Sequence, residues 1–383
     1  MQRKSILWVP HTPGEAGARA RHEYFLPHLA SRHDVHVCTW STLSDRSIRG
    51  ILTVGKHIRA LRYSSFRKDG VTYHHLPRLY NLPPYSNPRN QSGMPLNQVW
   101  ARKWIRRIVA RHHIDAIICA HSSRGIGLPP FDLPIPVVFD YVDSLGSHSH
   151  LERTYVRNAD AVICVSTVLA ERAAAMNANV HYVPNGTDIR AIRTGSAERA
   201  RDKYKLGRKK VISLIGLTSS PRFYFIDAIR ALRQWRHDVL CLLVGGRDIE
   251  ARIRGTRPLE DELFRFTGPL PFSEIPDLYA ASDVGMYPAD ETEYFHSACP
   301  IKVIEYAAAG KPVVAPQLQE LMRLPLANVI LAEPEPVPFA RALLKAIGVG
   351  PRQYCVSKFD VANLARRLEK IILDVIAGHR RRS

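Results

Sequence analysis

The sequence predicts an α/β protein made of two consecutive domains, each built on a doubly wound parallel sheet. Short apolar segments rich in β-branched residues alternate with helical patterns, which is the order that βαβ units produce. This alternation runs through the first half of the chain and restarts near residue 210. The chain has 383 residues, of which 45% are hydrophobic, and this length exceeds what one hydrophobic core usually supports.

Six strand segments are expected in the first half. They are ILWV (6–9), DVHVCTW (34–40), IDAIICA (114–120), PVVFDYV (136–142), DAVICVS (160–166) and HYVP (181–184). Helical patterns separate several of them, for example over residues 18–31 and 168–176. Because successive parallel strands need a crossover connection, we expect these segments to share one parallel sheet.

The second half repeats this arrangement. Its strand segments are KVISLIG (210–216), DVLCLLVGG (238–246), LFRFTG (263–268), DVGMYP (283–288) and KPVVAP (311–316). Helical patterns near residues 225–235, 274–281 and 300–309 lie between them. The turn sequence VPNGTD (183–188) and the polar residues after it separate the two series, so we expect a hinge there.

These patterns divide the chain into four parts. We predict an N-terminal domain over residues 1–184, a hinge over 185–200, a C-terminal domain over 201–358, and a C-terminal helix with a basic tail over 359–383. The last helix is predicted from apolar residues at helical spacing in FDVANLARRLEKIILDVI, which the basic residues HRRRS follow.

The cysteines and the first residues favour a cytoplasmic protein. Six cysteines stand singly, without a C-x-x-C pair or a zinc-ligand spacing, so we expect six buried, unreactive thiols in a reducing compartment. Only four consecutive apolar residues, Ile6 to Val9, follow the basic start, which is too short for a signal peptide. No other stretch approaches eighteen apolar residues, so no membrane span is expected.

The positive charge is concentrated in one part of the chain. The formal net charge is +19, and residues 46–111 contain fourteen Lys or Arg residues but one acid, Asp69. Charge of one sign at this density indicates an anionic partner, such as anionic lipid, a phosphorylated substrate or nucleic acid. A solvated surface without a partner is the alternative.

One predicted helix, VWARKWIRRIVARHH (99–113), combines this charge with aromatic residues. At about 100° per residue, one half of the helix is apolar and the other is basic. The apolar half holds Trp100, Trp104, Ile105, Ile108 and Val109. The basic half holds most of Arg102, Lys103, Arg106 and Arg107. Either the helix lies on anionic lipid, or it packs inward with a basic outer face; no recognised nucleic-acid module accompanies it.

In each predicted domain, the loop after the first strand is a candidate for anion binding. The first contains Gly14 and Gly17 before a helix. The second, Gly216 to Phe225, offers Ser219, Ser220 and Arg222 before a helix. Backbone amides at a helix N-terminus and an arginine favour phosphate, although plain surface turns remain the alternative.

The stretch CPIKVIEYAAAGKPVVAP (299–316) predicts a helix with a charged pair near its start. Pro300 suits the first turn and Gly310 ends the helix. Lys302 and Glu305 are three residues apart, which allows an ordinary ion pair. The helix follows a parallel strand, however, and therefore starts at the edge of the sheet where ligands bind. There, a carboxylate accepts hydrogen bonds from sugar hydroxyls and a lysine meets phosphate.

At these residues the chain resembles a known family. The segments FTGPLPFSEIPDLYAASDVGMYP and SACPIKVIEYAAAGKPVVA, with VPNGTD and the glycine-containing first loop, are similar to bacterial GT-B glycosyltransferases. The similarity is to the large retaining group 1 family and to the related xanthan glucuronosyltransferase. It covers nearly the whole chain and is most specific over residues 266–316. It implies two Rossmann-like domains that face a cleft, with the C-terminal helix packing back on the N-terminal domain.

The resemblance also implies roles for individual residues. Glu305 matches the glutamate that binds the ribose hydroxyls of the donor, and Lys302 matches a lysine near the donor phosphates. The loop from Gly216 through Ser219 to Arg222 matches the one that faces the pyrophosphate. Gly268 matches a glycine beside the base, and Gly14 and Gly17 match the loop that meets the donor from across the cleft.

Two positions depart from the family pattern. Many retaining members have a second glutamate eight positions before the ribose-binding one, where this chain has Ser297. The phosphate loop often carries an arginine and a lysine, whereas here Phe223 follows Arg222.

The segment VVFDYVDSLGSHSH (137–150) supplies candidates for the catalytic base. By resemblance to the glucuronosyltransferase, Asp143 takes the proton of the acceptor hydroxyl, a step that needs a carboxylate or histidine within hydrogen-bond reach. Asp140 lies close by, and His148 and His150 are further candidates. A helix cap or a salt bridge is the alternative role for both aspartates.

Taken together, these features predict a cytoplasmic glycosyltransferase that needs neither metal nor cofactor. No D-x-D motif is present, so Lys302, Arg222 and helix dipoles would neutralise the leaving phosphates. The expected donor is a UDP or GDP sugar, and the expected acceptor is a glycan or a lipid-linked hydroxyl at the inner membrane face. The product would belong to cell-surface polysaccharide or glycoconjugate biosynthesis. Two alternatives are a non-hydrolysing nucleotide-sugar 2-epimerase and a non-catalytic module that binds polyanions or membranes.

Overall fold

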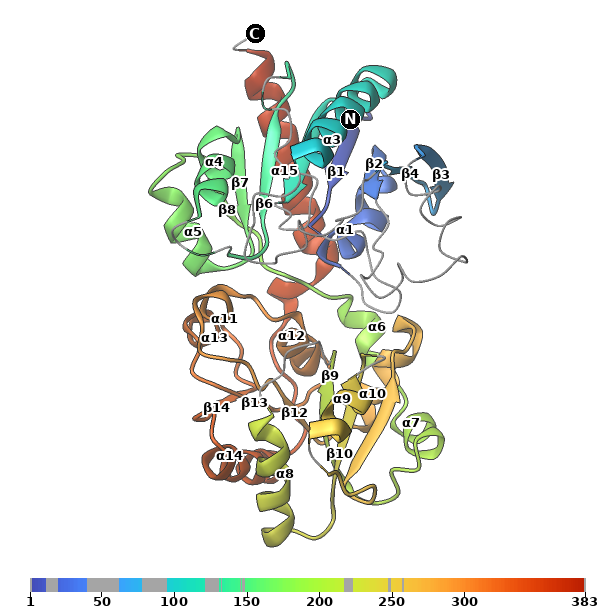
Figure 1. Cartoon of the computed structure of the whole chain (residues 1–383), viewed down its shortest axis with the longest axis vertical. Helices are drawn as coiled ribbons and strands as arrows, with labels where there is room; N and C mark the ends of the chain where they lie inside the picture. The colour runs from blue at the N-terminus through green and yellow to red at the C-terminus, as the bar shows by residue number, and fades with distance from the viewer. Residues whose placement is uncertain are drawn as a thin grey trace. The chain divides into compact units, whose positions relative to one another are not determined.

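The computed structural model describes residues 2–11, 20–39, 62–77, 95–120, 131, 133–144, 146, 149–216, 223–246, 249–256 and 258–381. The chain divides into two compact units, shown in Figure 1. The first unit contains Ala20–Val183 with the strand before it and Ala365–Ser383 after it, and the second contains Pro184–Leu364. Both are parallel-dominated α/β units, as the sequence predicts.

The first unit is built on an eight-stranded sheet with the order β3-β4-β2-β1-β5-β6-β7-β8. Its strands are β1 Ser5–Val9, β2 Asp34–Thr39, β3 Ser64–Lys68, β4 Val71–His75, β5 Ala116–Ala120, β6 Val137–Tyr141, β7 Ala161–Cys164 and β8 Val180–Tyr182. Its helices before the C-terminal one are α1 Arg21–Ala30, α3 Pro95–His112, α4 His150–Asn158 and α5 Thr167–Ala174. All six predicted strands of this half are present.

The hairpin β3–β4 is a part of this sheet that the sequence-based assignment missed. The two strands pair antiparallel, whereas β4 pairs parallel with β2. Asp69 and Gly70 connect them with φ angles of 50° and 79°, as in the two-residue turns that suit hairpins. Every residue of β3 is exposed, so the strand lacks the apolar pattern on which the prediction relied.

The second unit is built on a six-stranded parallel sheet with the order β11-β10-β9-β12-β13-β14. Its strands are β9 Lys210–Ile215, β10 Val239–Val244, β11 Phe264–Gly268, β12 Val284–Met286, β13 Val313–Ala315 and β14 Val329–Leu331. Its helices are α6 Ile189–Arg193, α7 Ala197–Lys203, α8 Tyr224–Trp235, α9 Ile249–Thr256, η3 Phe272–Glu274, α10 Ile275–Ala281, α11 Glu293–Ser297, α12 Ile301–Ala308, α13 Gln319–Arg323, α14 Pro336–Val349 and η4 Ser357–Phe359. The segment predicted as a hinge, 185–200, therefore includes α6 and the start of α7.

Each sheet has a point where the order of its parallel strands reverses. In the second unit, β9 pairs with β10 on one side and with β12 on the other. In the first unit, β1 pairs with β2 on one side and with β5 on the other. Connections leave such a point in opposite directions, so they open a crevice beyond the carboxyl ends of the two strands, where ligands bind.

Helices α8 and α14 lie side by side against the second sheet (Figure 1). The apolar residues of α8 recur at helical spacing, so Phe225, Ile229 and Leu232 are all fully buried. They share one hydrophobic cluster with Phe339 and Leu343 of α14 and with the strands beneath. This core fixes the sheet whose carboxyl edge carries the candidate site.

The C-terminal helix, α15 (Val361–Arg380), packs on the first unit, as the resemblance implies. The carboxylate of Glu369 accepts hydrogen bonds from Arg32 Nη1 at 2.7 Å and lies 3.0 Å from His33 Nε2. Near its end, Arg380 Nη2 donates to Asp115 Oδ1 at 2.7 Å. The helix thus extends into the basic residues that the sequence assigned to the tail.

Two further expectations concern thiols and membrane spans. Five of the cysteines are buried, but Cys355 is exposed, so the prediction of six buried thiols is wrong for that residue. Within the part of the chain that the structure describes, no helix combines the length and apolar character needed to cross a bilayer.

Candidate active site

The start of α12 lies at the strand-order reversal of the second sheet. Pro300 is the N-cap residue of α12, and Gly310, with a φ of 74°, follows its end, so both predicted helix limits are confirmed. Gly216 directly follows β9 and has a φ of 85°. A β-carbon on Gly216 would lie 2.8 Å from Cε of Lys302, so the lysine side chain crosses this glycine closely. The positive φ favours glycine, and a β-carbon at this position would also push the end of the Lys302 side chain aside.

Lys302 and Glu305 form a partly buried ion pair beside Gly216. Lys302 Nζ lies 3.0 Å from Glu305 Oε2. The side chain of Lys302 is 29% exposed, whereas that of Glu305 is fully buried. A buried carboxylate is costly unless hydrogen-bond donors surround it, and this site supplies them.

Two of those donors were not recognised in the sequence. The hydroxyl of Tyr279 donates to Glu305 Oε2 at 2.6 Å, and Thr187 Oγ1 donates to Glu305 Oε1 at 3.3 Å. Tyr279 lies in a helix with an ordinary apolar pattern, so its hydroxyl gave no separate signal. Thr187 belongs to VPNGTD, which the sequence analysis treated as a hinge turn.

The VPNGTD turn is held against the beginning of α12. Asn185 Nδ2 donates to the carbonyl of Cys299 at 2.7 Å. A β-carbon on Gly186 would lie 2.6 Å from the carbonyl oxygen of Phe359, so only glycine fits there. The turn therefore supports the site as well as connecting two segments.

Tyr306 fixes the other side of α12 to the sheet. Its hydroxyl donates to the carbonyl of Ser213 in β9 at 2.8 Å, and its ring lies against Gly285 of β12. The rings of Tyr306 and Tyr279 meet edge to face with centroids 4.9 Å apart. Burial raises the pKa of Tyr306, so its hydroxyl remains protonated and continues to donate. These contacts hold Lys302 and Glu305 in place from beneath.

Gly268 ends β11 at the same edge of the second sheet. Its carbonyl accepts a hydrogen bond from the backbone of Gly245 at 3.1 Å, and the amide of Gly216 donates to Val244 at 3.0 Å. Gly268 has a φ of 69°, and a β-carbon there would meet no atom within 4 Å. The structure thus brings Gly216, Gly268, Lys302 and Glu305 to one sheet edge.

Several other predicted site residues lie outside the part of the chain that the structure describes. Ser219 and Arg222 lie outside the described residues, as do Gly14, Gly17 and His148 of the earlier part of the chain. Ser297, at the position where many family members have glutamate, is buried and donates to the carbonyl of Tyr294 at 3.0 Å.

In the first unit, Asp143 lies beyond the carboxyl end of β6. Its Oδ2 atom is 3.9 Å from Nε2 of His11, which follows β1. Both side chains are partly exposed, at 24% and 29%. A carboxylate and an imidazole therefore meet at the ligand-binding edge of this sheet, in an arrangement able to accept a proton. His150 begins α4 as an exposed residue, with Nδ1 3.4 Å from Thr154 Oγ1.

Asp140 forms a buried salt bridge, which is the structural role proposed for it as an alternative to catalysis. It is buried and accepts a hydrogen bond from Arg21 Nε at 3.0 Å. Arg21 also donates to the carbonyl of Val183 at 2.7 Å. Burial raises the pKa of Asp140 while Arg21 opposes that change, so the pair ties α1 to the sheet.

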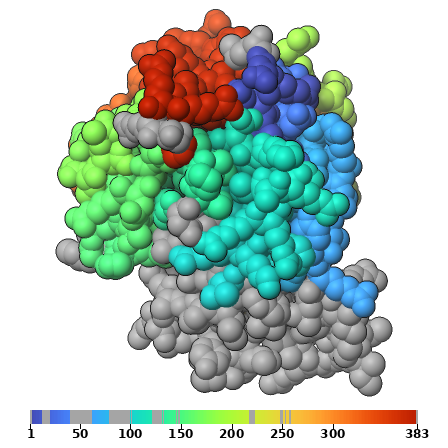
Figure 2. Space-filling model, turned by 90° about the horizontal axis from the view of Figure 1, so that it is seen from above, coloured from blue at the N-terminus to red at the C-terminus, as the bar shows by residue number. Residues whose placement is uncertain are grey.

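Part of the apolar side of α3 packs inward, Trp104 and Val109 are half-buried, and the basic side is exposed. Ala101, Ile105 and Ile108 are buried in the first unit. The exposed cations are Lys103, Arg106, Arg107 and Arg111, while Arg102 is half-buried. Figure 2 shows α3, in teal, at the surface beside the β3–β4 hairpin. Trp100 belongs to the helix, but its side chain lies outside the described set.

Trp104 forms an aromatic and cationic pocket with the segment that precedes β3. Its ring stacks on Tyr63 with centroids 4.4 Å apart, and the guanidinium of Arg107 lies 4.8 Å from the Trp104 ring centre. A pocket of about 500 Å³ adjoins this stack. The described residues that line it are Tyr63, Trp104, Arg107, Ile108, Ala110 and Arg111.

Comparisons with known proteins point to one family. The family model described as "Glycosyl transferases group 1" matches residues 210–348, and that described as "Glycosyl transferase 4-like domain" matches residues 16–186. TuaH of Bacillus subtilis (strain 168), assigned as a teichuronic acid biosynthesis glycosyltransferase, is 26% identical over 205 residues, or 51% of each chain. The chain spans about half the length of the curated relatives it matches.

Solved structures share the whole fold at low identity. Sucrose-phosphate synthase from Thermosynechococcus elongatus has a TM-score of 0.66 at 16% identity, covering 99% of both chains. HepE of Anabaena, solved in complex with UDP, has a TM-score of 0.57 at 19% identity, covering 99% of this chain and 98% of that one. The two family models between them match most of the residues. The chain thus belongs to the group 1 glycosyltransferases and has their two-domain, Rossmann-like GT-B fold.

Proposed function

We propose that this chain transfers a sugar from a nucleoside diphosphate donor to a hydroxyl group of a glycan or a lipid-linked acceptor. The observation that carries the proposal is the Lys302–Glu305 pair beside Gly216, at the strand-order reversal of the second sheet. HepE, a protein of similar fold, was solved in complex with UDP and with UDP-glucose. This supports UDP as the nucleotide of the proposed donor. TuaH supports an acceptor that belongs to a cell-surface polysaccharide.

The ion pair suggests how the donor enters. Three side chains in the described part of the chain donate to Glu305, and of these Tyr279 and Thr187 are fully buried whereas Lys302 is partly exposed. Lys302 is therefore the partner that can turn toward an arriving diphosphate. Once Lys302 has moved, Oε2 of Glu305 can accept a hydrogen bond from a ribose hydroxyl. The hydrogen bonds from the hydroxyls of Tyr279 and Thr187 keep the carboxylate in place.

In the transfer step, the bond between the anomeric carbon and the diphosphate oxygen breaks, and a bond to the acceptor oxygen forms. The acceptor loses its proton, and we assign that proton to Asp143, with His11 beside it. The diphosphate leaves with increased negative charge. Lys302 and the start of α12 stabilise that charge, so the proposed reaction needs no metal ion at the donor phosphates.

The acceptor side is assigned to the first unit. The exposed cations of α3 and the Tyr63–Trp104 pocket offer charge and aromatic surface to an anionic, sugar-bearing acceptor. Because Ala101, Ile105 and Ile108 of α3 are buried and its cations are exposed, the helix would meet an anionic membrane mainly through its basic side. We therefore propose a peripheral position at the inner membrane face.

Substitution of Glu305 tests the proposal. UDP affinity is measured by calorimetry, and transfer is followed by product formation from UDP-sugars with a panel of hydroxyl acceptors. The Glu305→Ala variant should lose transfer and most of its UDP affinity, whereas Glu333→Gln, at an exposed glutamate, should keep both. Normal transfer by Glu305→Ala would exclude this site, and an epimerised donor sugar without acceptor would indicate the epimerase reaction instead.

A further inference from the structure

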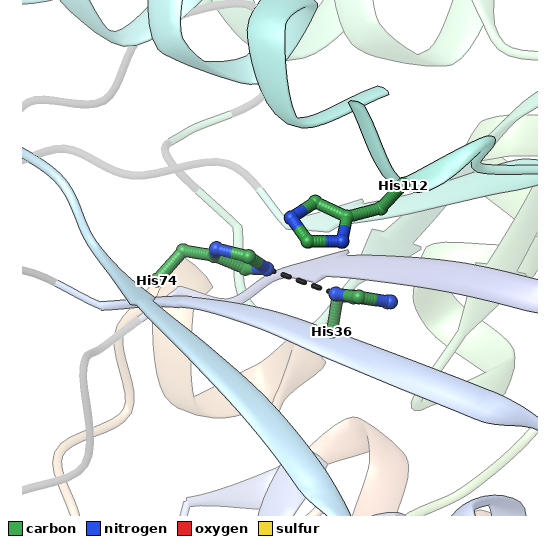
Figure 3. A group of neighbouring side chains, drawn as sticks. All are labelled: His36, His74 and His112. Atoms are coloured by element: carbon green, nitrogen blue, oxygen red, sulfur yellow. Dashed lines mark hydrogen bonds between the residues drawn. The ribbon is translucent and has the colours of Figure 1, made fainter. Parts of the chain in front are cut away.

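Three histidines that are far apart in the sequence come together in the first unit. His36 lies on β2, His74 on β4 and His112 at the end of α3, and Figure 3 shows their rings converging. One nitrogen from each lies within 4.8 Å of the others. His36 Nδ1 and His74 Nε2 are 2.9 Å apart. No pair of these histidines has the close spacing of a metal motif, so the sequence alone does not reveal this cluster.

We propose that His36, His74 and His112 bind one divalent transition-metal ion of the zinc class. Three imidazoles without a thiolate or carboxylate suit Zn²⁺ and its first-row neighbours, and they do not suit Mg²⁺ or Ca²⁺. Nitrogen ligands about 2.0–2.1 Å from a tetrahedral ion are separated by roughly 3.3–3.4 Å. The cluster reaches that geometry if His36 and His74 separate slightly and His112, the least buried ring, moves inward. Water or an anion would fill the fourth position.

Hydrogen bonding supports the assignment. The hydroxyl of Tyr63 lies 2.8 Å from Nδ1 of His74, an outer contact that orients the ring and leaves Nε2 for the ion. In the described part of the chain, the ring nitrogens of His112 have no hydrogen-bond partner. Its ring instead packs against the other two, with its centroid 4.7 Å from the ring centroid of His36 and 5.0 Å from that of His74. A bound ion would engage the nitrogen that faces the other two.

Burial keeps the three rings in the uncharged form that metals require. It is the main reason that the pKa of His36 falls to about 4 and that of His74 to about 3, and it also lowers the pKa of His112. Nearby charges also change these pKa values. Arg67 lowers the pKa of His36 and Arg111 lowers that of His74, whereas Asp34 raises the pKa of His36. The surplus of positive charge weakens binding of a cation, so the coordinate bonds must supply the affinity.

The competing explanation is a metal-free chain of hydrogen bonds from Tyr63 through His74 to His36. Such a chain needs no contribution from His112. Substitution of His112 therefore distinguishes a metal site from a metal-free hydrogen-bond chain. Its neighbour His113 provides a matched control. His113 is exposed and has a φ of 49°, a conformation that asparagine tolerates.

The experiment uses the full chain without an affinity tag, stripped with a chelator and then titrated with Zn²⁺ against a chromophoric competitor. Wild type and His113→Asn should each bind one Zn²⁺ per chain with equal affinity, and His112→Asn should bind at least about tenfold more weakly. Tyr63→Phe should weaken binding to a smaller extent. Equal zinc affinity in His112→Asn and His113→Asn would overturn the proposal.

Two measurements cover the case in which a variant folds poorly. Co²⁺ added to the wild-type chain should produce the intense visible bands of a tetrahedral site, and excess Zn²⁺ should remove them. Zn²⁺ should also raise the melting temperature of wild type, whereas Mg²⁺ should not. Absence of cobalt bands together with an unchanged melting temperature would show that the cluster binds no metal. These results do not depend on glycosyl transfer.

Discussion

Lys302 packs over Gly216 so closely that a β-carbon on the glycine would lie 2.8 Å from the lysine Cε, nearer than two such atoms normally come. The residue after β9 and the second residue of α12 are therefore packed as one unit, although 86 positions separate them in the sequence (302 minus 216). A side chain at residue 216 would force the end of the Lys302 side chain to shift.

Gly216→Ala should weaken UDP binding at least tenfold, because it displaces Lys302 and strains a backbone with a φ of 85°. A loss of about 1–2 kcal/mol in unfolding free energy should accompany it. Gly207→Ala is the matched control, since Gly207 has a φ of 57° but open space around it. It should share the strain and retain UDP affinity in calorimetry. If both variants bind UDP normally, the approach of Lys302 is not required.

Lys302→Met should separate phosphate binding from nucleoside binding. The variant should lose at least about tenfold in UDP affinity, the value expected for one charge-assisted hydrogen bond. Uridine affinity should change little, because Glu305 remains. Lys345→Met, at an exposed lysine on α14, is the control. Equal losses for UDP and uridine would place Lys302 away from the phosphates.

Asp143→Asn should keep UDP affinity and lose transfer. An amide cannot accept the proton of the acceptor, so kcat should fall by about 10²–10⁴ with little change in KM for the donor. Asp69→Asn, in the exposed turn between β3 and β4, controls for the substitution because asparagine tolerates its φ of 50°. Unchanged kcat in Asp143→Asn would remove Asp143 from the reaction.

Stability should fall in mild acid because buried histidines resist protonation. Burial lowers the pKa of His22 from 6.5 to about 4, so only the unfolded chain gains this proton between those values. The contribution is fully present above pH 6.5 and declines as the pH falls toward 4. His22→Phe should reduce the loss of unfolding free energy between pH 7 and pH 5 by about 2 kcal/mol in urea titrations. An equal pH dependence in both proteins would contradict this account of His22.

Charge reversal on α3 should test contact with an anionic surface. Arg106→Glu should reduce sedimentation with vesicles containing phosphatidylglycerol, and the difference should shrink in high salt. The same change at an exposed cation of the second unit, Arg254→Glu, should have a smaller effect. Equal binding by both variants would indicate that α3 does not meet the membrane.

The sequence was sufficient to predict most of the fold because buried parallel strands are short, apolar and regularly interrupted by helices. Glu305, Lys302 and Gly216 could be placed at one edge for the same reason, since each follows or begins an element at a known end of the sheet. Thr187 and Tyr279 escaped notice because their hydroxyls act through tertiary contacts that no local pattern contains. The histidine cluster escaped for a related reason, because its members come from three separate elements.

The contacts of Thr187 have a practical consequence for enzyme engineering. Its amide donates to the carbonyl of Phe359 and its carbonyl accepts from Val361, so two distant passages of the chain run alongside each other there. A transfer of the proposed donor site into a relative therefore calls for a cassette that carries both passages, from Pro184 to Leu364. A graft that took α12 and its neighbouring strands alone would leave out Thr187, whose hydroxyl donates to Glu305.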